Sequence, residues 1–279
     1  MKHNLKVECI PHFIKGKAGN LYTVYFPPQK TKHTPRNIIY IPPFSEEANR
    51  CRAMTSLQAR TLASQGVGVL IIDPFGTGDS AGNFVDGNWQ LWLEDILTGI
   101  NWLKQEYNYD CDTLWGTRLG AMLAIDVAYQ LESIKNLIFW QPVVNGKNFL
   151  TQFLRIRIAA ELNEKNGIKS TSELRQQFKN GESVEVSGYE VSSELAISID
   201  DLKISKLLSL NKININWFDV HSTEKIITSR ATQKVLNECK QTKTTLTLHQ
   251  IKGPAFWQLH ERFLAPDLIK ATTAVITGI

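Results

Sequence analysis

The sequence predicts an α/β fold in which helices cover both faces of a doubly wound, mostly parallel sheet. Short apolar runs, typical of buried strands, alternate along the chain with stretches whose apolar residues recur every three or four positions. Such alternation indicates a parallel sheet built from crossover units. The length of 279 residues fits one large domain, or one domain that carries an insertion.

The expected elements follow from these patterns in order. We expect strands at residues 21–26, 37–41, 67–73, 113–115, 136–140, 215–220 and 244–251, and helices at 46–65, 88–107, 119–131, 149–162, 171–180 and 228–239. The segment 67–73, VGVLIID, is apolar almost throughout, which is typical of a strand buried on both faces. Pro42 and Pro43 end one strand, and Gly66 ends the helix that precedes another.

The alternation of strands and helices is interrupted once. It stops after Gln141 and Pro142, gives way to a charged stretch with helical segments, and resumes at about residue 215. We therefore expect a core formed by residues 1–142 and 210–279, with a helical cap inserted at 143–209.

The composition excludes several classes of protein. Hydrophobic residues make up 43% and charged residues 21%, which excludes a disordered chain or a coiled coil. A net charge of +4 without a basic run predicts no nucleic-acid partner. The apolar run at 67–72 is too short to span a membrane, and the N-terminus has no signal peptide, so we expect a cytoplasmic protein without a transmembrane segment. The four cysteines are dispersed, and we expect no metal and no cofactor.

The most informative motif follows the strand at 113–115. The segment Gly116-Thr117-Arg118-Leu119-Gly120 has the spacing of the nucleophile elbow of α/β hydrolases, a tight turn between a strand and a buried helix. Arg118 stands at the central position, where the nucleophile belongs. A guanidinium stays charged and cannot attack a carbonyl. The standard serine mechanism is therefore excluded at this turn, and we assign no catalytic residue to it.

A second segment, Gly78-Asp79-Ser80-Ala81-Gly82, matches the same motif by letters alone. Five residues separate it from the preceding strand, and no helix is expected to begin at Ser80. We interpret it as a structural glycine-rich loop. No GK[ST] follows it, so a phosphate loop is not indicated either.

The base of a catalytic triad is also missing from its expected place. The loop after the last strand begins Gly253-Pro254-Ala255-Phe256-Trp257, without a histidine. We expect His249 inside that strand and His260 on the next helix. Asp219 or Glu224 could occupy the position of the acid, but an acid without a base has nothing to orient. Replacing Arg118 with serine would accordingly restore the motif without restoring esterase activity.

The charge of Arg118 needs compensation at the amino end of a helix. Glu46 and Glu47 follow the neighbouring strand, so either carboxylate could pair with Arg118. The alternatives are that both glutamates lie on a solvated first helical turn, or that Arg118 holds an external anion. Gln141 and Trp257 lie after other strand ends and complete the expected site with Thr117 and Leu119. Most tryptophans are expected in the core, with Trp140 and Trp257 as the exceptions.

Several longer segments resemble the exosortase A system-associated hydrolases of Gram-negative bacteria, of the type called hydrolase 2. These segments include PPFSEEANRCRAM (42–54), IDPFGTGDSAGNF (72–84), LWGTRLGAMLA (114–124), FWQPVVNGKNFLTQFLRIRIAAEL (139–162), GESVEVSGYEVSSEL (181–195) and GPAFWQ (253–258). The resemblance covers most of the chain. It implies a capped α/β-hydrolase fold, an arginine in the elbow, and an association with exopolysaccharide production and protein sorting.

Two hypotheses about function remain open. In the first, the protein binds an anionic or acylated intermediate, such as a polysaccharide precursor, beneath the cap with Arg118 as the anchor. In the second, it is a hydrolase or acyl-transfer enzyme of exopolysaccharide metabolism that uses other residues. The candidates are Asp79, Ser80, Glu46, Asp219 and His260. The sequence leaves the oligomeric state open.

Overall fold

The computed structural model describes residues 7–29, 36–161, 170–222 and 227–278. Its main sheet has eight strands in the order β1-β2-β4-β3-β5-β6-β9-β10. The strands β1 and β2 pair antiparallel, as do β2 and β4, whereas all other neighbours in this sheet pair parallel. The predicted α/β class with a mostly parallel sheet is thus confirmed.

The bounds of the elements agree with the sequence patterns to within a few residues for most of the chain. The strands are β1 (Ile10–Lys15), β2 (Asn20–Phe26), β3 (Arg36–Ile41), β4 (Val67–Ile72), β5 (Cys111–Thr117), β6 (Asn136–Trp140), β7 (Val184–Val186), β8 (Tyr189–Val191), β9 (Asn214–His221) and β10 (Thr245–Lys252). The α-helices are α1 (Glu46–Ser64), α2 (Trp89–Tyr107), α3 (Gly120–Gln130), α4 (Gly146–Ala160), α5 (Thr171–Lys179), α6 (Ser193–Asp201), α7 (Arg230–Cys239) and α8 (Pro266–Thr277). Two short 3-10 helices, η1 (Phe84–Asp86) and η2 (Ile204–Ser209), complete the described elements.

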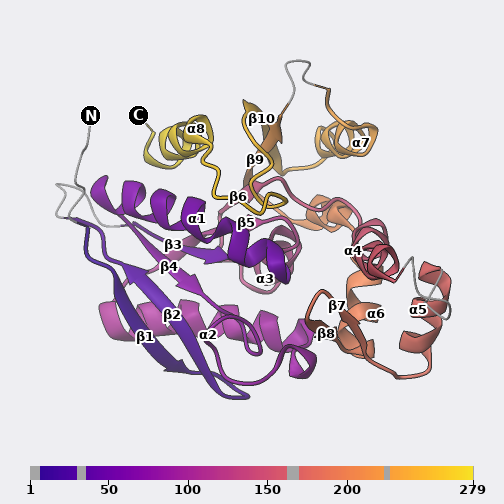
Figure 1. Cartoon of the computed structure of the whole chain (residues 1–279). Helices are drawn as coiled ribbons and strands as arrows, with labels where there is room; N and C mark the ends of the chain where they lie inside the picture. Colours follow the sequence, from indigo (N-terminus) through magenta and orange to yellow (C-terminus); the bar gives the residue numbers. More distant parts are fainter. Residues whose placement is uncertain (1–6, 30–35, 162–169, 223–226, 279) are drawn as a thin grey trace.

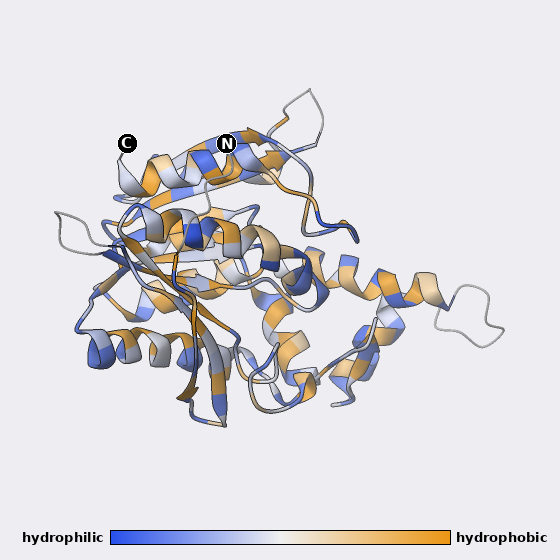
Figure 2. Cartoon of the chain, turned by 60° about the vertical axis from the view of Figure 1, so that its left-hand side comes forward, coloured by the Kyte–Doolittle hydropathy of each residue, from blue (hydrophilic) through white to orange (hydrophobic). Residues whose placement is uncertain are grey.

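Helices cover both faces of the sheet, as Figure 1 shows. On one face, α1 and α8 pack against buried side chains of β4, β5, β6 and β9. On the other face, α2, α3 and α7 belong to a larger cluster that continues into α4, α5 and α6. The strands and the inward faces of the helices carry most of the hydrophobic residues (Figure 2). No helix of the described part of the chain is long and apolar enough to cross a membrane.

The segment between β6 and β9 lies beside the sheet and contains α4, α5, α6, η2 and the hairpin β7–β8 (Figure 1). The main sheet continues across it, because β6 pairs directly with β9. Gly146 begins α4 where the carbonyl oxygen of Ile199 leaves no space for a Cβ atom. The domain boundaries expected at 143 and 209 remain a prediction.

Several described elements were not expected from the sequence. They are β1, α6, the two strands of the hairpin β7–β8 and the 3-10 helices η1 and η2, and the helix after the last strand, α8, begins later than expected. The hairpin had a sequence signal, because Ser187-Gly188 stands between two short alternating segments, VEV and YEV. Both turn residues adopt positive φ. The strand β1 alternates between exposed and more buried positions and pairs only with β2, so its pattern is weak.

The turn between β5 and α3 has the predicted elbow geometry. Arg118 adopts φ of 54°, a left-handed conformation that is strained for a residue with a side chain. Its amide donates a hydrogen bond to the carbonyl oxygen of Trp140. A Cβ atom on Gly116 would lie 2.6 Å from backbone atoms of Ala121, and one on Gly120 would lie 2.5 Å from the Ile41 carbonyl oxygen. Both glycines are therefore required by close backbone packing.

The glycine-rich loop after β4 is held by a buried carboxylate on α2. Asp95 is fully buried, and its Oδ2 accepts a hydrogen bond of 2.8 Å from the amide of Phe75. Its Oδ1 has no hydrogen-bond partner among the described residues. Burial raises the pKa of Asp95 to about 6, and the Phe75 amide opposes this rise.

We expect Gly120→Ala to lower the free energy of unfolding by about 1–3 kcal/mol, because the added methyl group overpacks a junction of two backbone segments. Gly253→Ala is the matched control, because its Cβ would meet only side-chain carbons of Ala265 and Val220 at 3.3 and 3.5 Å. Urea denaturation of the two variants measures the difference. Equal stability of both variants would contradict the packing argument.

We expect the free energy of unfolding to fall as the pH rises from about 4 to about 6, because Asp95 has its pKa raised from 3.8 to about 6 in the folded state. The folded state then binds more protons than the unfolded chain within this window. A rise of this size corresponds to about 2–3 kcal/mol.

Asp95→Asn should reduce this pH dependence without removing it, because burial also raises the pKa values of Glu47 and Asp219. Asp201→Asn, at an exposed position of α6, should leave it in place. Urea titrations at several pH values between 4 and 7 test both. A slope in Asp95→Asn equal to that of the wild type would contradict the assignment to Asp95.

Candidate functional site

Arg118 lies at the carboxyl edge of the sheet, at the amino end of α3. Its Nε donates to both carboxylate oxygens of Glu47, at 3.2 and 3.3 Å. Its Nη1 donates to the carbonyl oxygen of Gln141 at 3.2 Å. Nη2 has no acceptor among the described residues, and Arg118 keeps 13% of its side chain exposed. The guanidinium is thus neutralised from within but retains free donors.

Two further residues fix the position of the guanidinium. Trp257 lies against Arg118, with its ring centroid 5.5 Å from Cζ, which allows a cation–π interaction. Gln141 has φ of 44°, which turns its carbonyl oxygen towards Arg118. The side-chain Oε1 of Gln141 accepts a hydrogen bond of 2.6 Å from the amide of Val220. Gln141, which follows β6, thus connects Arg118 at the end of β5 with Val220 near the end of β9.

Glu47 pairs with Arg118 as predicted, but Glu46 does not. Glu46 accepts hydrogen bonds at Oε2 from Asn49, at 2.9 Å, and from the hydroxyl of Tyr189, at 3.1 Å. Its Oε1 lies 3.8 Å from Nε of Arg50. The reason is helical geometry: adjacent residues of α1 point in directions about 100° apart, so only one can face the elbow. Glu46 instead joins α1 to the β7–β8 hairpin through Tyr189.

Burial governs the protonation of Glu47. It raises the pKa of this carboxyl, and the nearby charge of Arg118 opposes the rise without cancelling it. Desolvation likewise raises the pKa of the neighbouring Cys51 thiol well above its usual range. Cys51 is buried, so the thiol is not activated as a nucleophile.

A cavity of about 440 Å³ lies above Arg118, and we call it the arginine cavity. Its polar lining comprises Ser45, Glu46, Glu47, Arg50, Arg118, Gln152, Ser187, Gln258 and His260. Its apolar lining comprises Phe149, Phe153 and Ile156 of α4 together with Tyr189 and Trp257. The cavity is therefore amphipathic, with charged groups of both signs on one side and cap side chains on another.

The prediction for His260 was wrong. His260 is not on the next helix, because α8 begins only at Pro266. It lies in the loop after β10, on an exposed position that lines the arginine cavity. The loop is longer than expected, and proline at the first helical position was the signal for the true helix start. A histidine is thus present in the last loop, which removes one argument against activity in an Arg118→Ser variant.

The other predicted candidates lie elsewhere. The hydroxyl of Ser80 donates to the carbonyl oxygen of Asp73 and accepts from the amide of Tyr22, so it fastens the loop to β2. His249 lies inside β10 as predicted, with Nε2 2.9 Å from Oδ1 of Asn216. Asp79 donates its amide to the Asp73 carboxylate at 3.2 Å.

Asp219 is buried, with Oδ2 3.4 Å from Nε2 of His221. Burial raises the pKa of Asp219, and the neighbouring His221 opposes the rise. Neither side chain lines the arginine cavity. Glu224 lies outside the described residues.

The two remaining residues of the expected site, Thr117 and Leu119, and the tryptophan Trp140 do not line the arginine cavity. Thr117 is fully buried beneath the turn and cannot reach a ligand. Leu119 lines a second cavity on the other side of the cap hairpin. Trp140 belongs to the core, where its Nε1 donates to Thr272 at 2.9 Å. Of the two tryptophans expected outside the core packing, only Trp257 lines the site.

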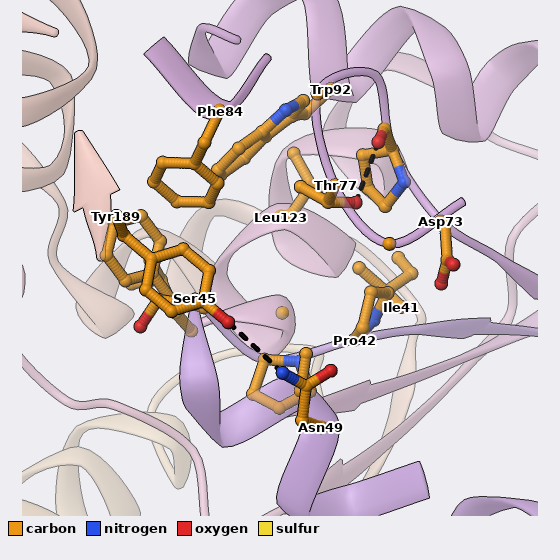
Figure 3. A pocket seen from close by; sticks show the side chains of 18 of the residues that line it. Ile41, Pro42, Ser45, Asn49, Asp73, Thr77, Phe84, Trp92, Leu123 and Tyr189 are labelled. Atoms are coloured by element: carbon orange, nitrogen blue, oxygen red, sulfur yellow. Dashed lines mark hydrogen bonds between the residues drawn. The ribbon is translucent and has the colours of Figure 1, made fainter. Parts of the chain in front are cut away.

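We call the second cavity, of about 340 Å³, the aromatic cavity. Its apolar lining includes Ile41, Pro42, Pro43, Phe44, Phe84, Trp89, Trp92, Leu119 and Leu123, and its polar side chains are Ser45, Asn49, Arg52, Asp73, Thr77 and Tyr189. Figure 3 shows Phe84, Trp92 and Tyr189 on one side and Asp73 on the other. Ser45 and Tyr189 line both cavities, so the two spaces adjoin at these residues. Sequence analysis missed this cavity.

The strand order, the strained turn after β5 and the cavity above it define an α/β-hydrolase fold. A sequence profile of the serine aminopeptidase S33 family matches residues 44–251, well over half of the chain. The chain belongs to this family of hydrolases. No curated protein sequence matched it.

Solved structures with the same fold include esterases. The chain is similar to Est1E from Butyrivibrio proteoclasticus bound to ferulic acid, with 17% identity, coverage of 96% of both chains and a TM-score of 0.63. It is also similar to DcsB in complex with a substrate analogue, with 15% identity, coverage of 97% and 99%, and a TM-score of 0.64. The Pyrococcus furiosus esterase Pf2001 has 14% identity, coverage of 100% and 92%, and a TM-score of 0.62. These likenesses concern the fold.

We expect Arg118→Met and Glu47→Gln each to lower the free energy of unfolding, because each leaves a desolvated charge or dipole without its partner. Breaking a buried ion pair costs about 3–5 kcal/mol. The two side chains keep 13% and 19% exposure, so we expect about 1–3 kcal/mol.

The double variant should lose less than the sum of the two single variants. Lys104→Met, which breaks the exposed pair of Lys104 with Asp110, is the control and should change stability little. Additive effects of Arg118→Met and Glu47→Gln would show that the pair is not coupled.

Proposed function

We propose that this chain is a ligand-binding member of the hydrolase superfamily, without a catalytic triad, that binds an anionic amphiphile in the arginine cavity. The observation that carries the proposal is Arg118 at the elbow, with Nε on Glu47 and Nη2 without an acceptor among the described residues. A guanidinium cannot serve as a nucleophile, but its remaining N–H groups can hold a carboxylate or a phosphate.

The local electrostatics favour an anion over a neutral group. Arg118 lies at the amino end of α3, where unpaired backbone amides add partial positive charge. Glu47 offsets the side-chain charge of Arg118, and burial raises the pKa of Glu47. Proton uptake by Glu47 would leave the Arg118 charge uncompensated, so anion binding and protonation of Glu47 should favour each other.

The apolar wall of the same cavity suits a hydrocarbon chain. Phe149, Phe153 and Ile156 come from α4 and face the cavity that contains Arg118. Ile156 is 49% exposed, so apolar surface of this wall is accessible to a ligand. An acyl chain against this wall would cover apolar surface while its anionic end reached the guanidinium.

For the chemical class of the ligand we rely on the sequence resemblance. Membership of the exosortase-associated family stays a prediction, and it suggests an acylated precursor of exopolysaccharide synthesis. A second candidate function is hydrolysis or acyl transfer by non-standard residues. It is favoured by His260, which lines the arginine cavity from the loop where α/β hydrolases carry their base.

We expect the full chain to bind dodecanoate more tightly than dodecanol, as measured by isothermal titration calorimetry, because only the carboxylate brings a negative charge to Arg118. Arg118→Met should remove this preference, a loss of about tenfold or more in affinity for a charge-assisted hydrogen bond. Lys104→Met, at an exposed lysine of α2, should bind as the wild type does.

Equal affinity of wild type and Arg118→Met for dodecanoate would contradict the proposal. Hydrolysis of p-nitrophenyl esters by the wild type, lost in His260→Ala, would favour the second candidate function. Labelling of a serine by a fluorophosphonate probe would do the same and would identify the nucleophile.

A further inference from the structure

We propose that the aromatic cavity is a separate binding site for a neutral glycosyl unit. This inference goes beyond the proposed function and does not depend on it, because Arg118 does not line this cavity. It rests on three properties of the described residues: a wall of aromatic rings, an ion pair with unused hydrogen-bonding capacity, and a size suited to a small ligand.

The aromatic wall is continuous. The ring of Phe84 lies 5.1 Å from Tyr189, 6.0 Å from Trp92 and 5.2 Å from Phe44, measured between centroids. Phe84 meets Tyr189 and Phe44 edge to face and is tilted against Trp92, which are favourable arrangements for aromatic pairs. Such a wall offers apolar surface to the C–H face of a pyranose ring.

The opposite side of the cavity is polar. Nη2 of Arg52 lies 2.9 Å from Oδ2 of Asp73, and the Asp73 side chain is only 7% exposed. Asp73 Oδ1 and the other guanidinium nitrogens of Arg52 have no hydrogen-bond partner among the described residues. The side-chain oxygen of Asn49 and the hydroxyl of Ser45 are likewise without partners within this part of the chain. This side of the cavity therefore offers hydrogen-bond donors from Arg52 and acceptors from Asp73 and Asn49.

These groups discriminate between ligand classes. A hydrocarbon chain would cover Asp73 and Arg52 without replacing their water, at a cost for each unpaired polar group. A cation would meet Arg52, and an anion would meet Asp73. A neutral ring with hydroxyl groups can donate to Asp73 and Asn49, accept from Arg52, and place its apolar face on Phe84 or Trp92.

The dimensions agree with a small ligand. The cavity of about 340 Å³ lies at the lower end of the range for small-molecule sites, about 300–1,000 Å³. Tyr189 lies at the boundary with the arginine cavity, and its hydroxyl accepts a hydrogen bond of 3.1 Å from Asn49 (Figure 3). The same hydroxyl donates to Glu46. A glycosyl unit bound here would be enclosed by a residue of the cap hairpin.

Saturation-transfer NMR on the full chain tests the proposal with methyl glucoside, methyl galactoside and methyl mannoside at millimolar concentrations. We expect saturation of the ring C–H protons for at least one of the three. Asp73→Asn should weaken binding about tenfold, as expected for a hydrogen bond to a charged group. Leu123→Phe, which fills the cavity from α3 without touching its polar side, should abolish binding.

Lys104→Met, at an exposed lysine that lines neither cavity, is the matched control and should leave glycoside binding unchanged. Because Arg118 does not line the aromatic cavity, the dodecanoate and glycoside experiments are independent, and failure of the two proposals is distinguishable. Melting temperatures close to that of the wild type must accompany each variant.

Absence of saturation for all three glycosides would overturn the proposal. So would saturation that survives both Asp73→Asn and Leu123→Phe, because the glycoside would then bind elsewhere. Saturation of dodecanoate or ferulate that Leu123→Phe abolishes, without any glycoside signal, would show that the cavity takes acyl or aromatic acids instead.

Discussion

The site is organised around one constraint: a permanent cation must be held on a tight, strained turn at the amino end of a helix. Arg118 cannot lose its charge, and the positive end of α3 opposes it. Three groups from different segments meet this constraint: the carboxylate of Glu47, the carbonyl oxygen of Gln141 and the ring of Trp257. The sheet supplies the rigid edge on which these segments converge, and the helix α1 supplies the counter-charge. The ion pair of Arg118 and Glu47 is largely buried, so both side chains are held in position.

The arginine cavity and the aromatic cavity adjoin but differ in their charged groups. One glutamate of α1 faces the elbow, and the next faces the cap, where Glu46 bonds to Tyr189. This contact places the cap hairpin between a cavity with a guanidinium anchor and a cavity whose own charges, Arg52 and Asp73, cancel. These charges are the basis on which we propose an anionic ligand for one space and a neutral polar ligand for the other. At the boundary between them, the hydroxyl of Tyr189, on the β7–β8 hairpin, bonds to Asn49 and Glu46.

The sequence was sufficient for those parts of the site that depend on strand ends. Parallel strands bring their carboxyl ends to one edge, so the proximity of Glu47 and Arg118 follows from neighbouring strands and needs no side-chain detail. The position of His260 does not follow in this way, because strand ends do not fix where a side chain of the following loop lies. Pro266 marks the start of the next helix and so places His260 in the loop, but not at the cavity. The aromatic cavity is assembled from the β3–α1 loop, the loop after β4, α2, α3 and the hairpin. Phe84 and Tyr189 are far apart in sequence, and no local pattern relates them.

The arginine at the central position of the turn is compatible with the electrostatics of a nucleophile elbow. In an acyl-transfer enzyme of this fold, the strained turn and the following helix end are placed where negative charge develops on the substrate oxygen. Those features persist here: the left-handed turn, the closely packed glycines and the free amino end of α3. A guanidinium at the same point adds donors to a place already suited to negative charge, and Glu47 prevents it from destabilising the fold. Geometry that stabilises a transient oxyanion in an enzyme can therefore hold a permanent anion in a binding protein, with no change in the order of the strands.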